Sequence, residues 1–260
     1  MESILSIKPL LALLVSLGVV PLILTSRTAN IRDAWSLIAG LVKFGIIASM
    51  VPHVMAGGTI EYTLAEVLPA LPIKLRVDAM GLMFALVSSF LWIVTTAYAI
   101  GYMRALKEHS QTRFYSFFAL SMTATIGVAF AANLLTLYLF YEMLSLSTYP
   151  LVTHLQDKES RISGRKYLTF LLGSSIGFLL PAMIMTYTMT GTLDFSGGGV
   201  FADTVSHSVI LVLLLLYVYG FAKAAIMPLH AWLPAAMVAP VPVSALLHAV
   251  AVVKVGVFCI

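Results

Sequence analysis

Four ionisable residues lie inside long apolar runs of this 260-residue sequence, where a charge is costly. Glu142 occurs in LYLFYEMLSLSTYPLV, and Lys223 occurs in YGFAKAAIMPLH. His248 and Lys254 share the run ALLHAVAVVKVGVF. Ionisable residues at membrane depth mark ion pathways and proton relays, or join helices as ion pairs. We therefore expect these four side chains to carry the chemistry of the chain.

The carboxylate of Glu142 and the amine of Lys223 are chemically complementary. Desolvation penalises both charged forms, and an ion pair between them offsets both penalties. When such a pair separates, the lysine releases its proton more readily. We therefore predict a switch in which Glu142 controls the proton on Lys223, which then passes to Lys254 with the help of His248. A static ion pair that joins two helices is the alternative interpretation.

Alternatives also stay open for the other ionisable residues. Lys254 follows His248 by six residues, or about 9 Å along a helix, and the two do not share a helix face. In the alternative interpretation of Lys254, its long side chain extends along the helix so that the amine reaches the membrane interface. In the alternative interpretation of His248, it is a hydrogen-bonded residue of the core. His230 and Asp78 are candidates for an accessory role in the proton pathway. Alternatively, His230 caps carbonyl groups that the helix break leaves free, and Asp78 caps the start of a helix. Lys43 is interpreted as structural or interfacial.

Apolar blocks that are long enough to cross a membrane must position these residues. Hydrophobic residues make up 60% of the sequence and charged residues 10%, which excludes an ordinary soluble domain. A membrane-spanning helix needs about 20 apolar residues. We predict an all-α, multi-pass membrane protein with about eight transmembrane helices in a single membrane domain, residues 1–260. The predicted spans are 9–25, 34–52, 79–102, 114–132, 134–153, 166–189, 207–226 and 241–260.

The seventh predicted span runs into a segment that is too long and too rich in proline for one helix. Pro228 and Pro234 interrupt this segment, and proline removes a backbone donor and clashes with the preceding turn. A break inside a membrane is tolerated only where protein or water satisfies the freed groups. We therefore predict a helix that is broken near Pro228, since broken helices often form ion sites at the membrane midplane.

Basic residues gather in alternate connections between the predicted spans. With the N-terminus outside, the inner connections hold Arg27, Arg32, Arg104, Lys107, Arg113, Lys158, Arg161, Arg165 and Lys166, and the outer segments hold Lys8, Lys74 and Arg76. Cytoplasmic loops carry such an excess, so we predict a cell-membrane protein with its N-terminus outside. This topology explains the net charge of +4 without nucleic acid. The outer interval 53–77 is predicted as a loop with a short strand or hairpin.

Motifs that hold a cofactor are absent from the sequence. It contains no GxxxxGK[ST], no GxGxxG after a strand, no HExxH and no CxxC. Cys259 is the one cysteine, which excludes an intrachain disulfide and a cysteine-based metal site. We therefore expect no cofactor, no metal and no catalytic site in this chain, even where a parent complex is an oxidoreductase.

Two stretches resemble the proton-antiporter-like membrane subunits. They are KAAIMPLHAWLPAAMVAPVPVSALLHAVAVVKVGVF, residues 223–258, and FYEMLSLSTYPLV, residues 140–152. The family includes the pumping subunits of respiratory complex I (NADH dehydrogenase), subunits of the Mrp sodium/proton antiporter and membrane subunits of energy-converting hydrogenases. By this resemblance, Glu142 matches the glutamate of the fifth helix and Lys223 the lysine of the broken seventh helix. Lys254 and His248 match residues of the eighth.

The resemblance implies translocation of protons, or of a monovalent cation such as Na⁺ with protons, in a larger membrane complex. Family members resemble two inverted five-helix units, and this sequence corresponds to the first. The second repeat is expected on a missing part of the subunit or on a partner polypeptide, and the apolar ending VFCI favours the former. Other membrane subunits are the expected partners. A non-transporting scaffold subunit and half of an independent secondary transporter stay open as alternatives.

Overall fold

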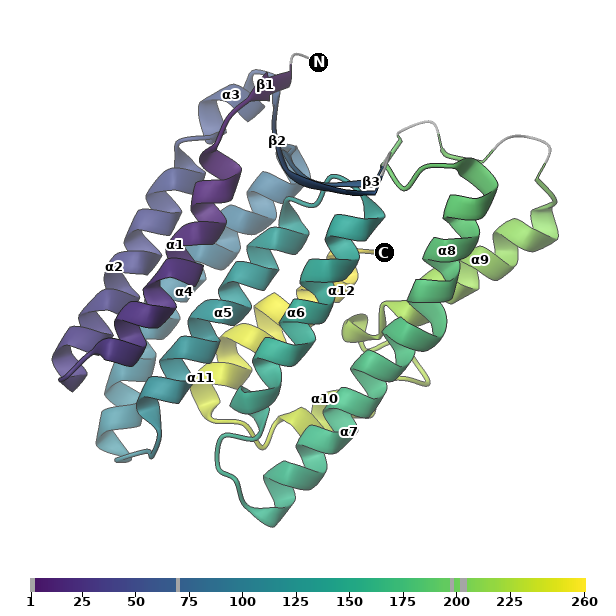
Figure 1. The fold of residues 1–260 in the computed structure, drawn as a ribbon. Coiled ribbons are helices and arrows are strands. Elements are labelled where there is room, and N and C mark those ends of the chain that lie inside the picture. Colours follow the sequence, from purple (N-terminus) through teal and green to yellow (C-terminus); the bar gives the residue numbers. More distant parts are fainter. Residues whose placement is uncertain (1–2, 69–70, 197–198, 202–204) are drawn as a thin grey trace.

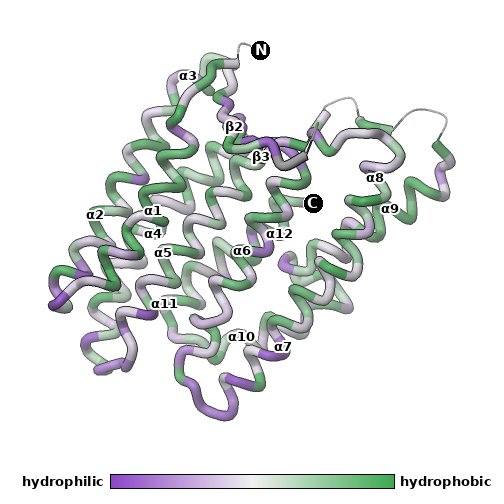
Figure 2. Tube along the Cα trace, in the orientation of Figure 1, coloured by the Kyte–Doolittle hydropathy of each residue, from purple (hydrophilic) through white to green (hydrophobic). Residues whose placement is uncertain are grey.

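The computed structural model describes residues 3–68, 71–196, 199–201 and 205–260. Helices dominate, and consecutive long helices run up and down beside one another (Figure 1). Apolar residues line the helices, and hydrophilic residues concentrate toward the two ends of the bundle (Figure 2). This distribution is that of a bundle whose middle lies in hydrocarbon and whose ends meet water.

Five helical segments of the described residues are long and apolar enough to cross a membrane. They are Lys8–Thr25, Ala29–Met55, Ala79–Ala105, Lys158–Thr190 and Val241–Phe258. The prediction of a mostly helical, multi-pass membrane protein is therefore confirmed. The predicted spans 114–132, 134–153 and 207–226 also coincide with helices, but these are less apolar or shorter.

One side of the molecule is a bundle of five long helices. They are α1 (Lys8–Thr25), α2 (Ala29–Ala48), α4 (Ala79–Ala105), α5 (Gln111–Ala129) and α6 (Leu134–Val152), with the short α3 (Val51–Met55) after α2. The central helix is α5, which packs against α1 and α6 and has 14 buried residues out of 19. Because α5 faces protein rather than lipid, it tolerates the serine and threonine residues that lower its hydropathy.

Polar side chains begin several of these helices. Thr28, Asp78, Asn133 and Asp157 each accept a hydrogen bond from the backbone N–H three residues later, at the first turns of α2, α4, α6 and the following α7. These caps satisfy backbone donors that have no partner inside the helix. Asp78 therefore has the capping role that the sequence analysis left open.

The other side of the molecule begins with a long continuous helix. A π-helical turn, Ser175–Leu179, joins α7 (Lys158–Ser174) to α8 (Leu180–Thr190). The next helix, α9 (His207–Gly220), packs against this turn. A Cβ atom on Gly220 would lie 2.7 Å from the backbone nitrogen of Leu179, so the close approach of the two helices requires a glycine here.

The helix α9 ends six residues before the end of the predicted span 207–226. A 3₁₀ turn, Ala222–Ala224, follows it, and Ala225 has a left-handed backbone with a φ of 55°. Pro228 follows a cis peptide bond in the irregular segment beyond, and Pro234 lies inside the short α10 (Trp232–Ala236). The backbone departs from the α-helix at Phe221, and beyond it the backbone N–H of Lys223 donates to the hydroxyl of Tyr141 in place of a carbonyl in α9.

The last helical segment returns along the first bundle. It consists of α11 (Val241–Val243), a π-helical stretch, Ser244–Val252, and α12 (Val253–Phe258). The π-helical stretch packs against α4 and α5, and α12 packs against the 3₁₀ turn. A Cβ atom on Gly256 would collide with the backbone of Lys223 and Ala224. The 3₁₀ turn is therefore enclosed between α6 and α12.

A small sheet closes one end of the bundle. The strands β2 (Thr59–Leu68) and β3 (Leu71–Val77) form an antiparallel hairpin, and β1 (Ser3–Leu5) pairs with β2 in parallel. The expectation of a hairpin within 53–77 is confirmed, whereas β1 was not expected in an all-α chain. The hairpin is bonded to the α5–α6 connection, since Arg76 N donates to Phe130 O and Lys74 N donates to Thr136 Oγ1, at 2.7 and 3.0 Å.

Candidate functional site

Lys223 is fully buried in the 3₁₀ turn, and α6 provides its contacts. Its Nζ donates to Tyr141 O at 2.8 Å and to Ser145 Oγ at 2.7 Å, and it lies 3.1 Å from the centroid of the Tyr141 ring. The Tyr141 hydroxyl accepts the Lys223 backbone N–H at 3.2 Å. From the other side, Trp232 Nε1 donates to Ala222 O at 2.9 Å. The amine is thus held by neutral acceptors alone.

Glu142 is the next residue of α6 after Tyr141, and it is half-buried. Its Oε1 atom is buried and has no hydrogen-bond partner among the described residues. Within the described parts of the chain, the ion pairs closer than 4.0 Å do not include Glu142 with Lys223. The predicted Glu–Lys ion pair is therefore not formed in this structure, although both groups lie at the same level of the bundle core.

A line of buried hydroxyl groups leads away from Lys223. Ser145 Oγ contacts the amine, and Thr148 lies three residues further along α6. Thr148 Oγ1 is 2.5 Å from Tyr167 OH, and the Tyr167 ring packs against the His248 ring with centroids 6.4 Å apart. These hydroxyl residues are not among the candidates predicted from the sequence. The spacing S-x-x-T after Glu142 was a usable signal, but nothing local marks Tyr167, which comes from α7.

The two ionisable residues of the last helix have different surroundings. His248 is buried, its ring packs against Trp232 and Tyr167, and neither ring nitrogen has a hydrogen-bond partner in the described part of the chain. Lys254 is exposed and borders an apolar groove between α4 and α12, with Met83 and Phe84 on the opposite wall. The structure therefore brings Lys223, Glu142 and His248 into one region and leaves Lys254 at its outer surface.

The remaining candidates contribute no hydrogen bond to this region. The Asp78 carboxylate is occupied at the start of α4, where it accepts the Gly81 N–H at 2.7 Å. His230 is exposed between the 3₁₀ turn and α10, and its side chain makes no hydrogen bond within residues 3–68, 71–196, 199–201 and 205–260. The roles suggested for His230 stay predictions.

Lys43 is a second fully buried lysine, on α2. Its Nζ donates to Ser16 Oγ at 2.7 Å and to Met122 O at 3.0 Å, and Ser16 Oγ is 2.8 Å from Thr123 Oγ1. The interfacial interpretation of Lys43 is therefore wrong, because the side chain points into the bundle. It joins α1, α2 and α5 through neutral partners.

A family model and individual relatives of this chain point to the same protein family. The family model described as "NADH:quinone oxidoreductase/Mrp antiporter, TM" matches residues 131–260, half of the chain. The provisionally named antiporter subunit mnhA2 of Staphylococcus haemolyticus is 32% identical over 233 residues, which cover 86% of this chain and 28% of that protein. Its namesake in Staphylococcus aureus strain JH9 is 34% identical over 190 residues, or 72% of this chain and 23% of that protein.

A solved structure supports the fold over nearly the whole chain. A chain of the membrane-bound sulfane sulfur reductase, an archaeal respiratory membrane complex, superimposes with a TM-score of 0.83 at 23% identity. The match covers 97% of this chain and 51% of that chain. This chain thus spans about half of that structure and less than a third of the mnhA2 proteins.

Proposed function

Because the chain belongs to the NADH:quinone oxidoreductase/Mrp antiporter family of membrane subunits, we propose that it translocates protons, or a monovalent cation with protons, as an antiporter-like subunit of a larger membrane complex. One observation carries the proposal. A buried amine, Lys223, rests on neutral acceptors beside the unpartnered carboxylate oxygen of Glu142. The names of the mnhA2 relatives favour an antiporter complex over a redox-driven pump.

The switch works through two positions of the Glu142 side chain. In the described arrangement, a carbonyl, a hydroxyl and an aromatic ring face the Lys223 amine. These groups stabilise an ammonium ion less than a carboxylate does, so this arrangement favours release of the proton. When Glu142 turns to the amine, an ion pair forms and the lysine retains its proton. Glu142 thereby sets the proton occupancy of Lys223.

The hydroxyl groups beyond Lys223 give the released proton a direction. Ser145, Thr148 and Tyr167 lead from the amine toward His248. Hydroxyl groups both donate and accept hydrogen bonds, so a chain of them can pass a proton when water completes the gaps. Lys254, at the surface of the last helix, is the proposed exit from this chain. The groove beside it is apolar, which suits a further helix as the continuation of the path.

The whole subunit is proposed to lie in the cell membrane with its N-terminus outside. The connections α1–α2, α4–α5 and α6–α7 lie at the end remote from the sheet (Figure 1), and these connections carry the basic excess. A single membrane domain forms the first of two repeats, and the second repeat and further membrane subunits are the proposed partners.

Substitutions of the two central residues in the assembled complex test this function. Glu142→Gln and Lys223→Arg are expected to lower proton transport about a hundredfold, the scale of a lost proton-transfer group. Arginine keeps the positive charge but does not release its proton, so a static ion pair would tolerate it. Glu159→Gln and Lys158→Arg, exposed at the start of α7, are the matched controls. Transport is measured as a pH change inside vesicles.

Two results would contradict the proposal. Normal transport in Lys223→Arg would remove the proton switch. Loss of assembly in Glu142→Gln and Lys223→Arg, with normal transport per assembled complex, would assign the two residues to a scaffold. Assembly is followed by copurification of the partner subunits, so the two outcomes are distinguishable.

A further inference from the structure

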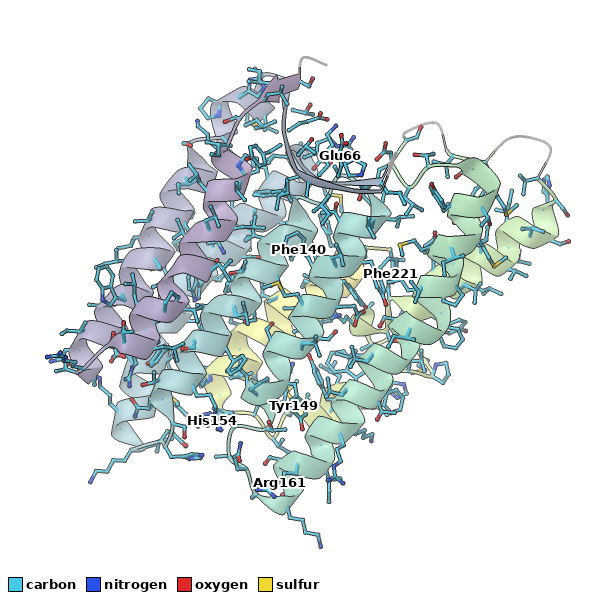
Figure 3. The ribbon with its side chains drawn as sticks, in the orientation of Figure 1. Glu66, Phe140, Tyr149, His154, Arg161 and Phe221 are labelled. Carbon is cyan, nitrogen blue, oxygen red and sulfur yellow. The ribbon has the colours of Figure 1, made fainter. Side chains whose placement is uncertain are left out.

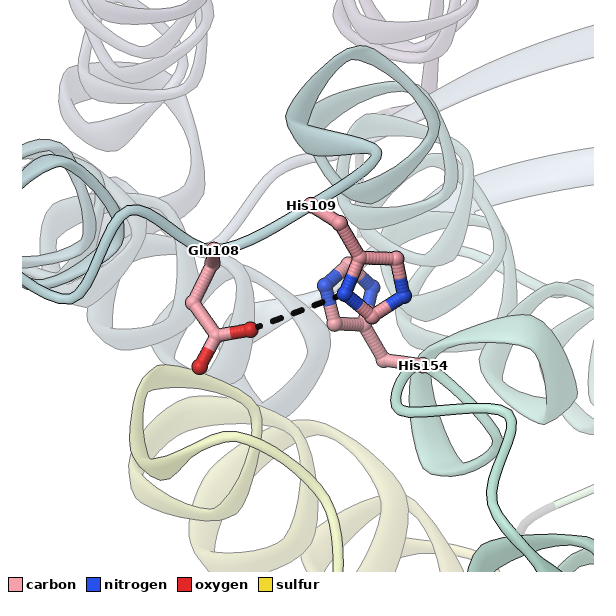
Figure 4. Close-up of side chains that lie close together, drawn as sticks. All are labelled: Glu108, His109 and His154. Carbon is pink, nitrogen blue, oxygen red and sulfur yellow. Dashed lines mark ion pairs between the residues drawn. The ribbon is translucent and has the colours of Figure 1, made fainter.

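Two connections bring three metal-binding side chains together at the end of the bundle remote from the sheet. Glu108 and His109 lie between α4 and α5, and His154 lies between α6 and α7 (Figure 4). His154 and Arg161 mark this end in Figure 3, whereas Glu66 of the hairpin marks the other. One ligand atom from each of the three side chains lies within 4.8 Å of the other two. None of these residues belongs to the proposed proton path.

His154 is an unusual histidine for a connection between helices. It is fully buried, and neither of its ring nitrogens has a hydrogen-bond partner among the described residues. A buried polar atom without a partner costs about 1–3 kcal/mol, so an imidazole with two such atoms calls for an explanation. The rings of His109 and Phe114 pack against it, with centroids 4.9 and 5.7 Å away. The ring is therefore fixed in place.

The loop before α5 presents the other two ligands. Glu108 Oε2 lies 4.0 Å from His109 Nδ1, and the His109 side chain is half exposed, so its ring is free to turn. The loop backbone is fixed, because Gln111 Nε2 donates to Glu108 O at 3.1 Å and to Met103 O at 2.9 Å. The Arg113 guanidinium is held close to this site, because its Nη2 donates to the His154 carbonyl at 2.9 Å. Its positive charge disfavours a bound cation. The Glu108 carboxylate offsets this charge.

We propose that Glu108, His109 and His154 bind a divalent transition-metal ion of the Zn²⁺ type. Two imidazoles and one carboxylate suit zinc, whereas Ca²⁺ and Mg²⁺ require oxygen ligands. Binding turns His109 out of its stack with His154 and brings the three ligand atoms to about 2.0–2.2 Å from the ion, with solvent as the fourth ligand. The ion then ties the α4–α5 connection to the end of α6, the helix that carries Glu142. The sequence gives no signal for this site, because its ligands come from two distant loops.

Zn²⁺ titration of the full chain, purified with its partner subunits, tests the site. Isothermal titration calorimetry measures the dissociation constant, and the visible absorption of Co²⁺ reports imidazole and carboxylate ligands. His109→Ala and Glu108→Gln are expected to weaken Zn²⁺ binding at least about tenfold, comparable to the loss of a supporting group in known metal sites. His207→Ala, an exposed histidine at the start of α9, is the matched control and should bind as the unaltered protein does.

The outcomes separate clearly. A single Zn²⁺ site that is weakened in His109→Ala and Glu108→Gln but not in His207→Ala supports the proposal. Absence of saturable Zn²⁺ binding in the unaltered protein, or equal affinity in all variants, overturns it. Because His154→Ala can disturb a buried position, it is used only with a thermal unfolding control. Zn²⁺ binding is measured without transport, so this result does not depend on the proposed proton switch.

Discussion

Tyr141 contacts Lys223 with its backbone carbonyl, its ring and its hydroxyl group. The hydroxyl accepts the Lys223 backbone N–H at the end of α9, so Tyr141→Phe leaves a buried donor without a partner. We expect the free energy of unfolding to fall by about 1–3 kcal/mol, as measured by denaturant unfolding in detergent. Tyr98→Phe, on the exposed face of α4, serves as the control. Equal stability of the two variants would contradict this role of the hydroxyl.

Two substitutions of Lys43, the second buried lysine, are expected to change the stability of the protein differently. Lys43→Met replaces the amine by an apolar side chain of similar size and removes the cost of a buried charge, so we expect little change in stability or an increase. Lys43→Ala instead leaves a cavity and is expected to cost about 2–5 kcal/mol. Thermal unfolding of both variants checks this order, and the reverse order would refute it. Because Lys43 lies outside the proposed path, Lys43→Met should also retain transport.

At the residue scale, the sequence draws attention to the buried charges but not to the side chains that contact them. An isolated Glu142 or Lys223 in an apolar run is conspicuous because membranes penalise charge. Tyr141, Ser145 and Tyr167 are ordinary residues in a membrane helix, and their importance depends on contacts across helices. The burial of Lys43 was available in part, because Arg32, Ser36 and Lys43 recur at helical spacing and share the buried face of α2.

At the scale of elements, the packing of α9 on the π-helical turn depends on Gly220. We expect Gly220→Ala to destabilise the protein by about 1–3 kcal/mol through overpacking against the Leu179 backbone. It should also lower transport, because α9 leads directly into the turn of Lys223. Gly173→Ala, with open space at its Cβ, is the control and should be neutral or stabilising. Unfolding and transport are measured on both variants, and equal stability of Gly220→Ala and Gly173→Ala would contradict this role of Gly220.

The start of α7 makes a pH-dependent contribution to stability. Side-chain and backbone hydrogen bonds from Ser160 lower the pKa of Asp157 below its usual value of 3.8. The folded carboxylate therefore contributes stability above about pH 4, and this contribution is lost as the pH falls through the folded pKa. Asp157→Asn keeps a capping oxygen without a titrating proton. We expect the melting temperature of this variant to depend less on pH between 5 and 2, and equal pH dependence would contradict the cap.

The start of α4 was predictable because Asp78 marks it, whereas α7 begins at Lys158, eight residues before the predicted span 166–189. The end of α9 was not predictable, because Pro228 is the obvious breaker in the sequence while the α-helix ends at Gly220. Beyond this end, the Tyr141 hydroxyl from another element takes the place of a helical acceptor, and no local sequence pattern marks such a contact. The π-helical turns were also missed, since they follow from packing rather than from a residue pattern.

At the scale of the whole molecule, the proposed orientation predicts two opposite labelling results. In a Cys259→Ser background, Glu66→Cys on the hairpin should react with a membrane-impermeant maleimide added to intact cells. Lys158→Cys, exposed at the start of α7, should react only after the membrane is opened. Each reaction is expected to be close to all or none, because the two positions lie on opposite sides of the hydrocarbon. The reverse pattern would place the N-terminus inside.

The multi-pass helical architecture could be predicted from the hydrophobic blocks of the sequence, whereas the short strand β1 could not. Among the described residues, five segments satisfy both the length and the apolarity of a span, and the predicted spans 114–132 and 134–153 coincide with α5 and α6 despite the polar residues of these helices. Those residues are tolerated because α5 is buried along most of its length and the hydroxyl side chains of α6 face the protein interior. The strand β1, only three residues long, leaves no periodic pattern that a sequence analysis could detect.

The hairpin at the end of the bundle restrains the backbone around the site but not its side chains. Lys74 and Arg76 bond directly to the start of α6 and the end of α5, and Asn133 Nδ2 donates to Pro72 O at 2.7 Å. With its first turn attached to the sheet, α6 does not slide along its axis without breaking these bonds. In the proposed switch, Glu142 would reach Lys223 by a change of side-chain rotamer, which is faster than a helix shift on the microsecond-to-millisecond timescale. The rate-limiting event would therefore be the arrival of a proton or water, not the movement of the protein backbone.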